Sequence, residues 1–291
     1  RNENSELFYG AIGGYGALGI IVEATLELTD NQKLERKQCL IPLADYPNYF
    51  EKVVQTDAQA VLHNADLFPP SYTQVLCTTW LNTDKPVTCQ NRLQHANYSP
   101  ANHLGMSVVK RVPAVQKARP LIKASFLESP TVVWRNYEAS YGVIDLFYPK
   151  LLSVSLLQEY FIPKDHLLLF LKEFKKIVTA HKVNIINVSL RHVSANNESV
   201  LSWSDKECFA VVIFYDQMRF QKSLTKSDLW TQQLIDTALS LGGTYYLPYR
   251  LSATQKQFLQ AYPRVETFKA LKKKYDPHNR FSNTFLEKMI L

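Results

Sequence analysis

Five glycines within ten residues near the start of the chain are the first residues whose spacing indicates chemistry. They are Gly10, Gly13, Gly14, Gly16 and Gly19, and the rest of the chain holds only four more. Glycine loses more backbone entropy on folding than other residues, so a cluster indicates backbone with positive φ or close to another group. Bare N–H groups in such a turn can lie flat against a ring system or a pyrophosphate. A tight loop beneath a sheet is the competing interpretation.

Residues 14–19 (GYGALG) match the G-x-G-x-x-G pattern of dinucleotide-binding Rossmann folds. That pattern requires a helix directly after the loop, because the helix N-terminus holds the pyrophosphate. Here residues 20–28 follow instead, and from Val22 onward their apolar and polar side chains alternate as in a half-buried strand. The sequence therefore excludes a Rossmann fold and predicts a glycine-rich turn that leads into a strand.

The composition is that of an ordinary soluble globular protein. The chain has 291 residues, of which 46% are hydrophobic and 20% charged, enough for two modest domains. No apolar run approaches the roughly 18 residues of a membrane-spanning helix. The four cysteines form no CxxC motif, so we predict no metal site and a reducing compartment. The net charge of +7 is spread along the chain, which argues against nucleic-acid binding.

Hydrophobic periodicity predicts mixed helices and strands after residue 30. Strands are expected at 38–43, 60–67, 73–81, 152–162, 183–193 and 208–215. Helices are expected at 46–55, 163–182, 224–241, 252–261 and 263–275, with Pro163 in the first turn of the second. Residues 82–130 carry several prolines and predict loops with one short helix. The fold class is therefore α+β.

Two separated motifs make the sequence recognisable. Residues 5–25 read SELFYGAIGGYGALGIIVEAT, and residues 262–265 (YPRV), 274–277 (KYDP) and 280–283 (RFSN) lie near the other end. The first run strongly resembles the ELFW…GGxGxxGII…AT signature of FAD-linked oxidases of the vanillyl-alcohol-oxidase type, and the second set resembles that family's C-terminal ending. Residues 242–246 (GGTYY) and 159–163 (EYFIP) also fit. The chain is most similar to the decaprenylphosphoryl-ribose 2-oxidase and aldonolactone oxidase branches.

The resemblance implies the last part of a two-subdomain FAD-binding domain, together with a cap domain that has an antiparallel sheet flanked by helices. Residues 1–33 and 244–291 then belong to the FAD domain and residues 34–243 to the substrate, or cap, domain. The family's N-terminal half is absent and the chain begins at Arg1 without an initiator Met. We therefore expect a fragment that is inactive alone and does not hold FAD tightly.

The chemistry implied by the resemblance is oxidation of a CH–OH group by hydride transfer to flavin N5, with a base that accepts the hydroxyl proton. Glu159 is the expected hydroxyl-binding or proton-accepting group, against the alternative of a polar residue on the outer face of a strand. Tyr249 takes the position of a lysine found near the flavin in the decaprenylphosphoryl-ribose branch, and Arg250 can supply the positive charge. Tyr246 completes the catalytic candidates, although Tyr246 and Tyr249 can equally be packed aromatics.

The implied cofactor contacts are Gly13, Gly14, Tyr15, Gly16, Gly19, Ile20 and Asn283. The decaprenylphosphoryl-ribose branch also has a cysteine on the strand that aligns with residues 209–214. In this sequence Val211 aligns with that cysteine, and Cys208 lies three residues before it. Arg191 and His192 can line the pocket or form a solvated strand end, and His278 is a loop residue that can reach the flavin edge. Lys272, Lys273 and Lys274 are expected to form a solvated helix end.

The leading hypothesis is an FAD-dependent oxidoreductase that acts on a sugar, a sugar lactone or a polyprenyl-phosphoryl sugar. The polyprenyl branch would imply a short-chain reductase partner and peripheral contact with a membrane surface. A cytoplasmic location, at the inner face of the membrane in that case, is expected. The alternative from another class is a non-catalytic module of the same fold that binds a ligand or partner. The enzyme hypothesis predicts that Tyr15, Tyr246 and Tyr249 converge.

Overall fold

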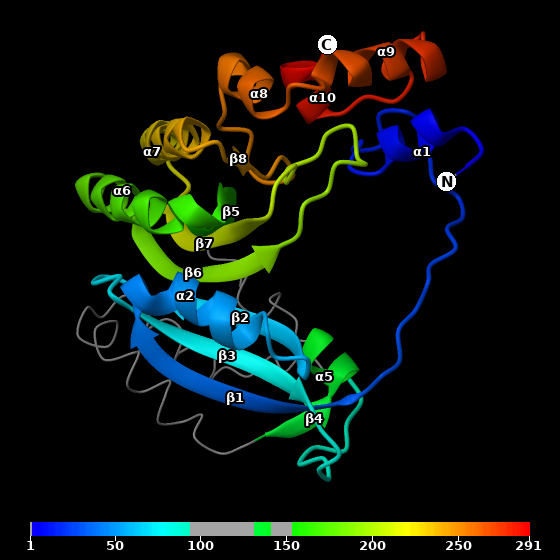
Figure 1. The fold of residues 1–291 in the computed structure, drawn as a ribbon. Helices are drawn as coiled ribbons and strands as arrows, with labels where there is room; N and C mark the ends of the chain where they lie inside the picture. Colours follow the sequence, from blue (N-terminus) through cyan, green and yellow to red (C-terminus); the bar gives the residue numbers. More distant parts are fainter. Residues whose placement is uncertain (1, 94–130, 141–152) are drawn as a thin grey trace.

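A single antiparallel sheet organises the protein. The computed structural model describes residues 2–93, 131–140 and 153–291 (Figure 1). Within these ranges eight strands pair in the order β4-β1-β3-β2-β6-β7-β5-β8, and each pairing is antiparallel. The strands are β1 (Lys33–Pro42), β2 (Ala60–Leu67), β3 (Gln74–Asn82), β4 (Val132–Trp134), β5 (Ser153–Pro163), β6 (Asn184–Val193), β7 (Cys208–Met218) and β8 (Thr244–Tyr245).

Helices cover this sheet and form a further layer at one end of it. They are α1 (Ser5–Ala11), α2 (Tyr46–Tyr49, continued by a π-helical turn, Phe50–Val54), α5 (Arg135–Ala139), α6 (Leu167–Ala180), α7 (Gln221–Ser240), α8 (Gln255–Ala261), α9 (Val265–Tyr275) and α10 (Thr284–Met289). The combination of helices with an antiparallel sheet confirms the α+β class.

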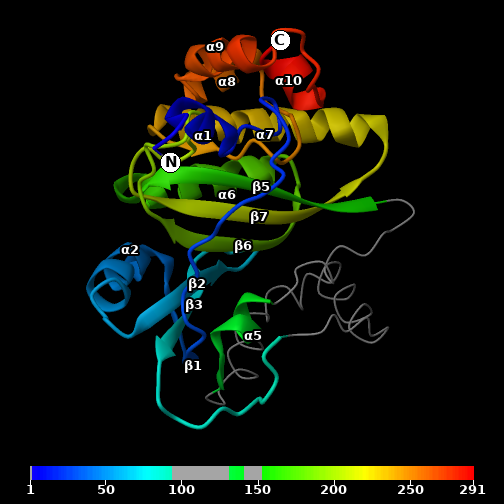
Figure 2. The same cartoon turned by 90° about the vertical axis from the view of Figure 1, so that its right-hand side faces the viewer.

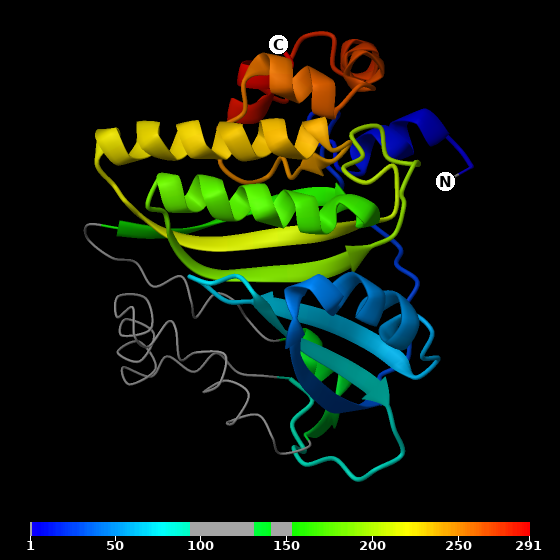
Figure 3. The ribbon, with the colours of Figure 1, turned by 60° about the vertical axis from the view of Figure 1, so that its left-hand side comes forward.

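One face of the sheet is covered by α2, α6 and α7, which lie in front of it in Figure 3. The ring of Tyr160 on β5 packs against Phe170 of α6, with centroids 5.5 Å apart. On the next strand, Tyr215 meets Trp230 of α7 at 5.0 Å. The helices α8, α9 and α10 lie beyond α7, close to α1 (Figure 1). Figure 2 looks onto the other face, where α5 lies near β1. The main core fills the space between the sheet and α2, α6 and α7, and it continues to α8, α9 and α10.

The predicted strands and long helices are confirmed, most of them with small shifts at their ends, although β1 begins five residues before the predicted start at residue 38. β2 has the predicted bounds, and α7 begins three residues earlier than predicted. Pro163 was expected in the first turn of a helix, but it is the last residue of β5 and pairs with Cys208. A short 3-10 turn then precedes α6. The prediction was wrong there because proline suits a strand end as well as a helix start.

The predicted strand at residues 20–28 is not formed. The chain from Ile20 to Gln32 is extended but has no strand pairing, and it runs from the glycine loop down to β1 (Figure 1). Its apolar side chains are exposed; Val22, for example, is 92% exposed. Alternation predicts a strand only where a partner strand can satisfy the backbone, and the described residues provide none for this segment.

The three-segment division of the chain stays a prediction, although the structure adds one fact to it. β8, the start of the predicted third segment, pairs with Tyr160 and Phe161 in the same sheet as the cap strands. Most of the loop region predicted at 82–130 lies outside the described residues. Within the described ranges, no helix combines the length and apolar character needed to cross a membrane.

Candidate active site

Glu159 lies on the sheet face opposite the α6 and α7 helices. Side chains alternate along β5, and the neighbouring Tyr160 packs under α6, so Glu159 points to the other face. Phe161 shares that face and contacts Trp203 and Tyr246, with ring centroids 6.1 and 5.9 Å away. The strand thus places a half-buried carboxylate beside an aromatic cluster.

Burial raises the pKa of Glu159 above its ordinary value. The positive charge of Arg191 on β6 and a hydrogen bond from the Tyr249 hydroxyl lower that pKa in part, but burial prevails. The pKa of the Tyr249 phenol is also raised, to about 12, by burial and by the charge of Glu159. The phenol therefore stays protonated at neutral pH and donates to the carboxylate.

Tyr246 is joined to Glu159 through the backbone. Its N–H donates to the Glu159 carbonyl over 3.0 Å, which extends the pairing between β8 and β5. The Tyr246 ring meets Tyr249 edge-on, with centroids 5.4 Å apart. Gly243 permits this approach, since a Cβ there would lie 2.4 Å from the Phe161 carbonyl oxygen. Three of the four predicted catalytic residues therefore come together.

Arg250, the fourth, is directed elsewhere. Its guanidinium donates to the Asp228 carboxylate over 3.1 Å, to Gln217 Oε1 over 3.4 Å and to the Leu224 carbonyl. Gln217 pairs with Val154, five residues along β5 from Glu159, or about 16 Å at 3.3 Å per residue. The cation that acts on Glu159 is Arg191, which the sequence left open as a solvated strand end.

The structure places Val211 and Cys208, the two residues compared with the cysteine of the related branch, on opposite faces of the sheet. Val211 lies in the main core on the helix-covered face. Cys208 instead clusters with Phe161 and Ala210 on the face of Glu159. Burial, with help from nearby carboxylates including Glu159, raises the pKa of the Cys208 thiol to about 12. Cys208 is therefore a neutral thiol at the edge of the site.

The glycine cluster forms a compact loop after α1. Gly14 donates its N–H to Ala11 O and accepts from Ala17 N–H, both over 3.0 Å. A Cβ at Gly14 would lie 2.3 Å from the Gly10 carbonyl oxygen, so only glycine fits. The loop therefore depends on close backbone contact, and no helix follows it.

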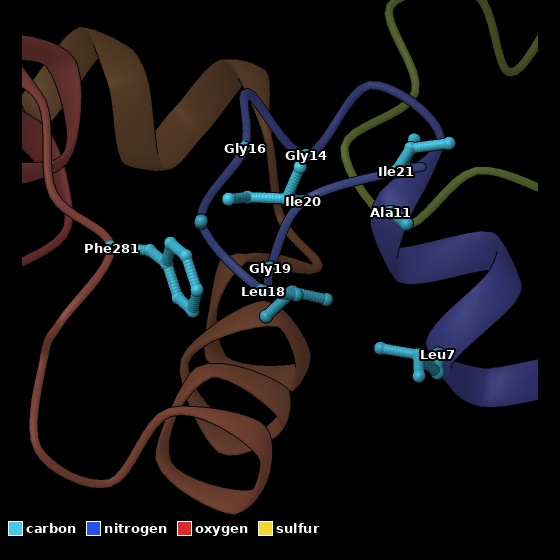
Figure 4. Close-up of a pocket in the computed structure, with 10 residues that line it drawn as sticks. Leu7, Ala11, Gly14, Gly16, Leu18, Gly19, Ile20, Ile21 and Phe281 are labelled. Carbon is cyan, nitrogen blue, oxygen red and sulfur yellow. The ribbon is translucent and has the colours of Figure 1, made fainter. Parts of the chain in front are cut away.

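This loop borders a cavity of about 510 Å³, shown in Figure 4. Leu7 of α1 lies on one side of it and Phe281 on the other (Figure 4). The lining is mainly backbone and apolar side chains: Leu7, Ala11, Gly14, Gly16, Ala17, Leu18, Gly19, Ile20, Ile21 and Phe281. Four of the seven predicted cofactor contacts, Gly14, Gly16, Gly19 and Ile20, are among them.

The cavity fits a flat aromatic group. At Gly16 and Gly19 a Cβ would project into open space, so the bare backbone leaves room that any other residue would fill. The apolar walls suit a ring system, and the volume lies within the ~300–1,000 Å³ usual for small-molecule sites. These residues can therefore hold the flavin part of FAD.

The other predicted contacts, Gly13, Tyr15 and Asn283, hold the loop in place. Gly13 turns the chain beside Trp203. Tyr15 packs on Phe285, with centroids 5.0 Å apart, and its carbonyl accepts from Asn283 Nδ2 over 2.9 Å. Asn283 Oδ1 also caps α10 by accepting from Leu286 N–H. The ring of Trp203, which Gly13 borders, also packs on Phe161 and Tyr246, so the glycine loop and the Glu159 cluster adjoin each other.

A buried ion pair that the sequence did not reveal joins the two family motifs. Lys272 and Asp276 are 2% and 3% exposed and form an ion pair. Lys272 Nζ also donates to Ala17 O over 2.9 Å and to Phe281 O over 2.6 Å. The expectation of a solvated Lys272 was therefore wrong, because Asp276 lies one helical turn away at i+4. Lys273 and Lys274 are exposed, as expected.

Comparison with known proteins identifies the family of the chain. The sequence profile of the D-arabinono-1,4-lactone oxidase family matches residues 24–289. No curated protein sequence matches the chain. The family consists of FAD-dependent oxidases of sugar lactones. The glycine loop precedes the matched range, but its contacts with Lys272 and Asn283 tie it to the matched C-terminal helices. Over most of its length, then, the chain belongs to the D-arabinono-1,4-lactone oxidase family.

Proposed function

We propose that this chain forms the substrate side of an FAD-dependent oxidase that oxidises a CH–OH group of a sugar lactone, with Glu159 as the proton acceptor. The observation that carries the proposal is the half-buried Glu159 carboxylate beside Tyr249 and Arg191, next to a glycine loop with an apolar cavity. When bound, the flavin supplies a hydride acceptor.

Glu159 would take the proton of the substrate hydroxyl. Burial raises the pKa of Glu159 and so makes the carboxylate a better base. The positive charge of Arg191 lowers this pKa in part. The Tyr249 hydroxyl donates to the carboxylate and fixes its orientation. The ring of Tyr246 packs against Phe161 and Tyr249 and forms an aromatic wall beside Glu159.

The cofactor would be held by Gly14, Gly16, Gly19 and Ile20, with Gly13, Tyr15 and Asn283 supporting the loop. Lys272 supports the same loop from behind through Ala17 O. Trp203 contacts both the loop, at Gly13, and the ring of Tyr246. We place the reacting carbon of the substrate between the loop and Glu159.

The test is a visible absorption spectrum of the full-length protein with FAD. Arabinono- and gulono-type lactones are added anaerobically, and a polyprenyl-phosphoryl ribose is tested in a separate arm. We expect a lactone to bleach the flavin band. If only the polyprenyl-phosphoryl ribose bleaches the band, the substrate is a polyprenyl-phosphoryl sugar and not a lactone. A protein that takes up no flavin from excess FAD would favour the non-catalytic binding module.

A further inference from the structure

Two cysteines face each other across neighbouring strands on the side of the sheet away from the proposed active site. Cys39 of β1 and Cys77 of β3 are directly opposite in the strand register. Both are free thiols and both belong to the core under α2, on the helix-covered face seen in Figure 3. Residues opposite each other in an antiparallel pair have Cβ atoms about 4.5–5.5 Å apart. A disulfide needs about 3.5–4.5 Å, so a small shift brings the two sulfurs into bonding distance.

The two thiols differ in access and in chemistry. Cys77 is 1% exposed, whereas Cys39 is half-buried. The neighbouring Cys77 thiol and Tyr49 hydroxyl favour a negative charge on the Cys39 sulfur, and together they outweigh burial and lower the pKa of Cys39. The same contact, with burial, raises the pKa of Cys77. Cys39 is therefore the nucleophile of the pair and Cys77 its protonated neighbour.

Neutral donors, not a cation, activate Cys39. Tyr49 also hydrogen-bonds Thr79, whose hydroxyl lies 2.9 Å from His63 Nδ1. Burial, with the nearby His192, lowers the pKa of His63 to about 4, so its ring is neutral at physiological pH. Asp66 is a carboxylate near the pair, and its charge further raises the pKa of Cys77.

We propose that Cys39 and Cys77 are a peroxide-oxidisable dithiol that closes into a disulfide between β1 and β3. The Cys39 thiolate attacks one oxygen of hydrogen peroxide; an S–O bond forms, the O–O bond breaks, and hydroxide leaves. Cys77 sulfur then attacks the sulfenic acid on Cys39; the S–S bond forms and the S–O bond breaks. The hydroxide released in this step takes up the Cys77 proton as water, and the hydroxide from the first step takes up the proton that the Cys39 thiol had lost to solvent. Overall, two thiols are oxidised by two electrons and one peroxide is reduced to two waters.

The oxidant comes from outside the pair, so the proposal does not depend on the proposed function. Closing the disulfide also removes the Tyr49 hydroxyl's acceptor, because the Cys39 thiolate no longer exists. Cys208 provides an internal comparison, since burial raises its thiol pKa to about 12 and no cysteine faces it in the strand register. We therefore expect this oxidation at the Cys39–Cys77 pair and not at Cys208.

The experiment treats the folded protein with a small excess of hydrogen peroxide, blocks remaining thiols by alkylation and maps peptides without reduction. We expect a peptide that links Cys39 to Cys77, with Cys208 still alkylated and reacting at least tenfold more slowly. Reduction with dithiothreitol should restore both thiols. Recovery of Cys39 and Cys77 as alkylated peptides, or oxidation of Cys208 at the same rate, would overturn the proposal.

Three variants separate the roles within the pair. Cys77→Ser should leave a sulfenic acid on Cys39 that dimedone traps, whereas Cys39→Ser should leave Cys77 unoxidised. Tyr49→Phe should slow the oxidation of Cys39 several-fold, because one hydrogen-bond donor is lost, yet still give the same linked peptide. Oxidation of Cys77 in the Cys39→Ser protein would contradict the assigned order. Circular dichroism checks that each variant folds, and the wild-type mapping decides the proposal if a variant does not.

Discussion

Asp276 and Glu159 are two shielded carboxylates that the protein treats in opposite ways. Asp276 binds the Lys272 ammonium and accepts backbone N–H groups from Arg280 and Phe281, each over 2.9 Å. Burial raises its pKa, but these partners outweigh burial and lower it to about 2. Glu159 has a phenol and a nearby cation instead, and burial leaves its pKa raised.

The difference lies in how fully each charge is satisfied. Lys272 makes three hydrogen bonds, to Ala17 O, Phe281 O and Asp276, so the buried pair is complete. The pair holds the glycine loop against the C-terminal helices. With these partners, the Asp276 carboxylate has little affinity for a proton. Glu159 lacks such a set and keeps its affinity for a proton. A carboxylate whose pKa is raised in this way is suited to proton transfer.

The largest expected effect is on the rate of oxidation in Glu159→Gln. The amide keeps the shape but cannot accept a proton, so flavin reduction by the lactone should fall about 10²–10⁴-fold with the melting temperature nearly unchanged. The matched control is Glu138→Gln on α5, where burial, Arg36 and Trp80 act on a carboxylate in the same pattern. An equal loss of rate in both variants would remove the special role of Glu159.

Lys272→Met should give the largest loss of stability. It leaves Asp276 buried without its counter-ion and frees Ala17 O, so the melting temperature should fall by roughly 10 °C. Lys273→Met, on the exposed side of the same helix, is the control and should change little. Equal melting temperatures for the two variants would show that the ion pair is not what fastens the loop.

Acid titration should show a smaller effect from the same pair. The pKa of Asp276, about 2 in the folded protein, lies below the value of about 3.9 for an unfolded aspartate. The stability that it contributes is therefore present above pH 4 and is lost as the pH falls towards 2. The melting temperature of the wild type should drop more steeply across this window than that of Lys272→Met. Parallel curves would argue against the assignment.

The smallest expected effect separates the two arginines near the site. Arg191 lowers the pKa of Glu159, so Arg191→Gln should raise it further and move the rising limb of the pH–rate profile to higher pH. Arg250→Gln removes a partly exposed ion pair with Asp228, worth about 1 kcal/mol or less, and two hydrogen bonds far from Glu159, so it should leave that limb in place. The reverse result would return Arg250 to the role first expected of it.

The elements that the sequence predicts well are those defined by local patterns. β2, β5, β6, β7 and α6 follow from period-two or helical spacing of apolar residues, because each buries one face against the same core. The short elements α1, β4, α5, β8 and α10 were missed. They are stabilised by tertiary contacts, as where Gly243 lets β8 approach β5.

The candidate site divides in the same way. The glycine cluster and Glu159 are recognisable by residue type and by the family signature, and the structure places them in adjoining parts of the molecule. The sequence does not reveal that Arg191, and not Arg250, lies near Glu159. Strand register across β5, β7 and β6 decides which cation reaches the carboxylate.

By itself, the sequence determined the family, the α+β class and the identity of the glycine loop and the carboxylate, since these depend on local residue types and their spacing. Only the tertiary structure decided that residues 20–28 have no partner strand, that Lys272 is buried and that Cys39 faces Cys77. These outcomes depend on pairing and burial between residues far apart in the chain. Coulomb and desolvation energies act over distance in space, and the order of residues does not reveal that distance until the chain is folded.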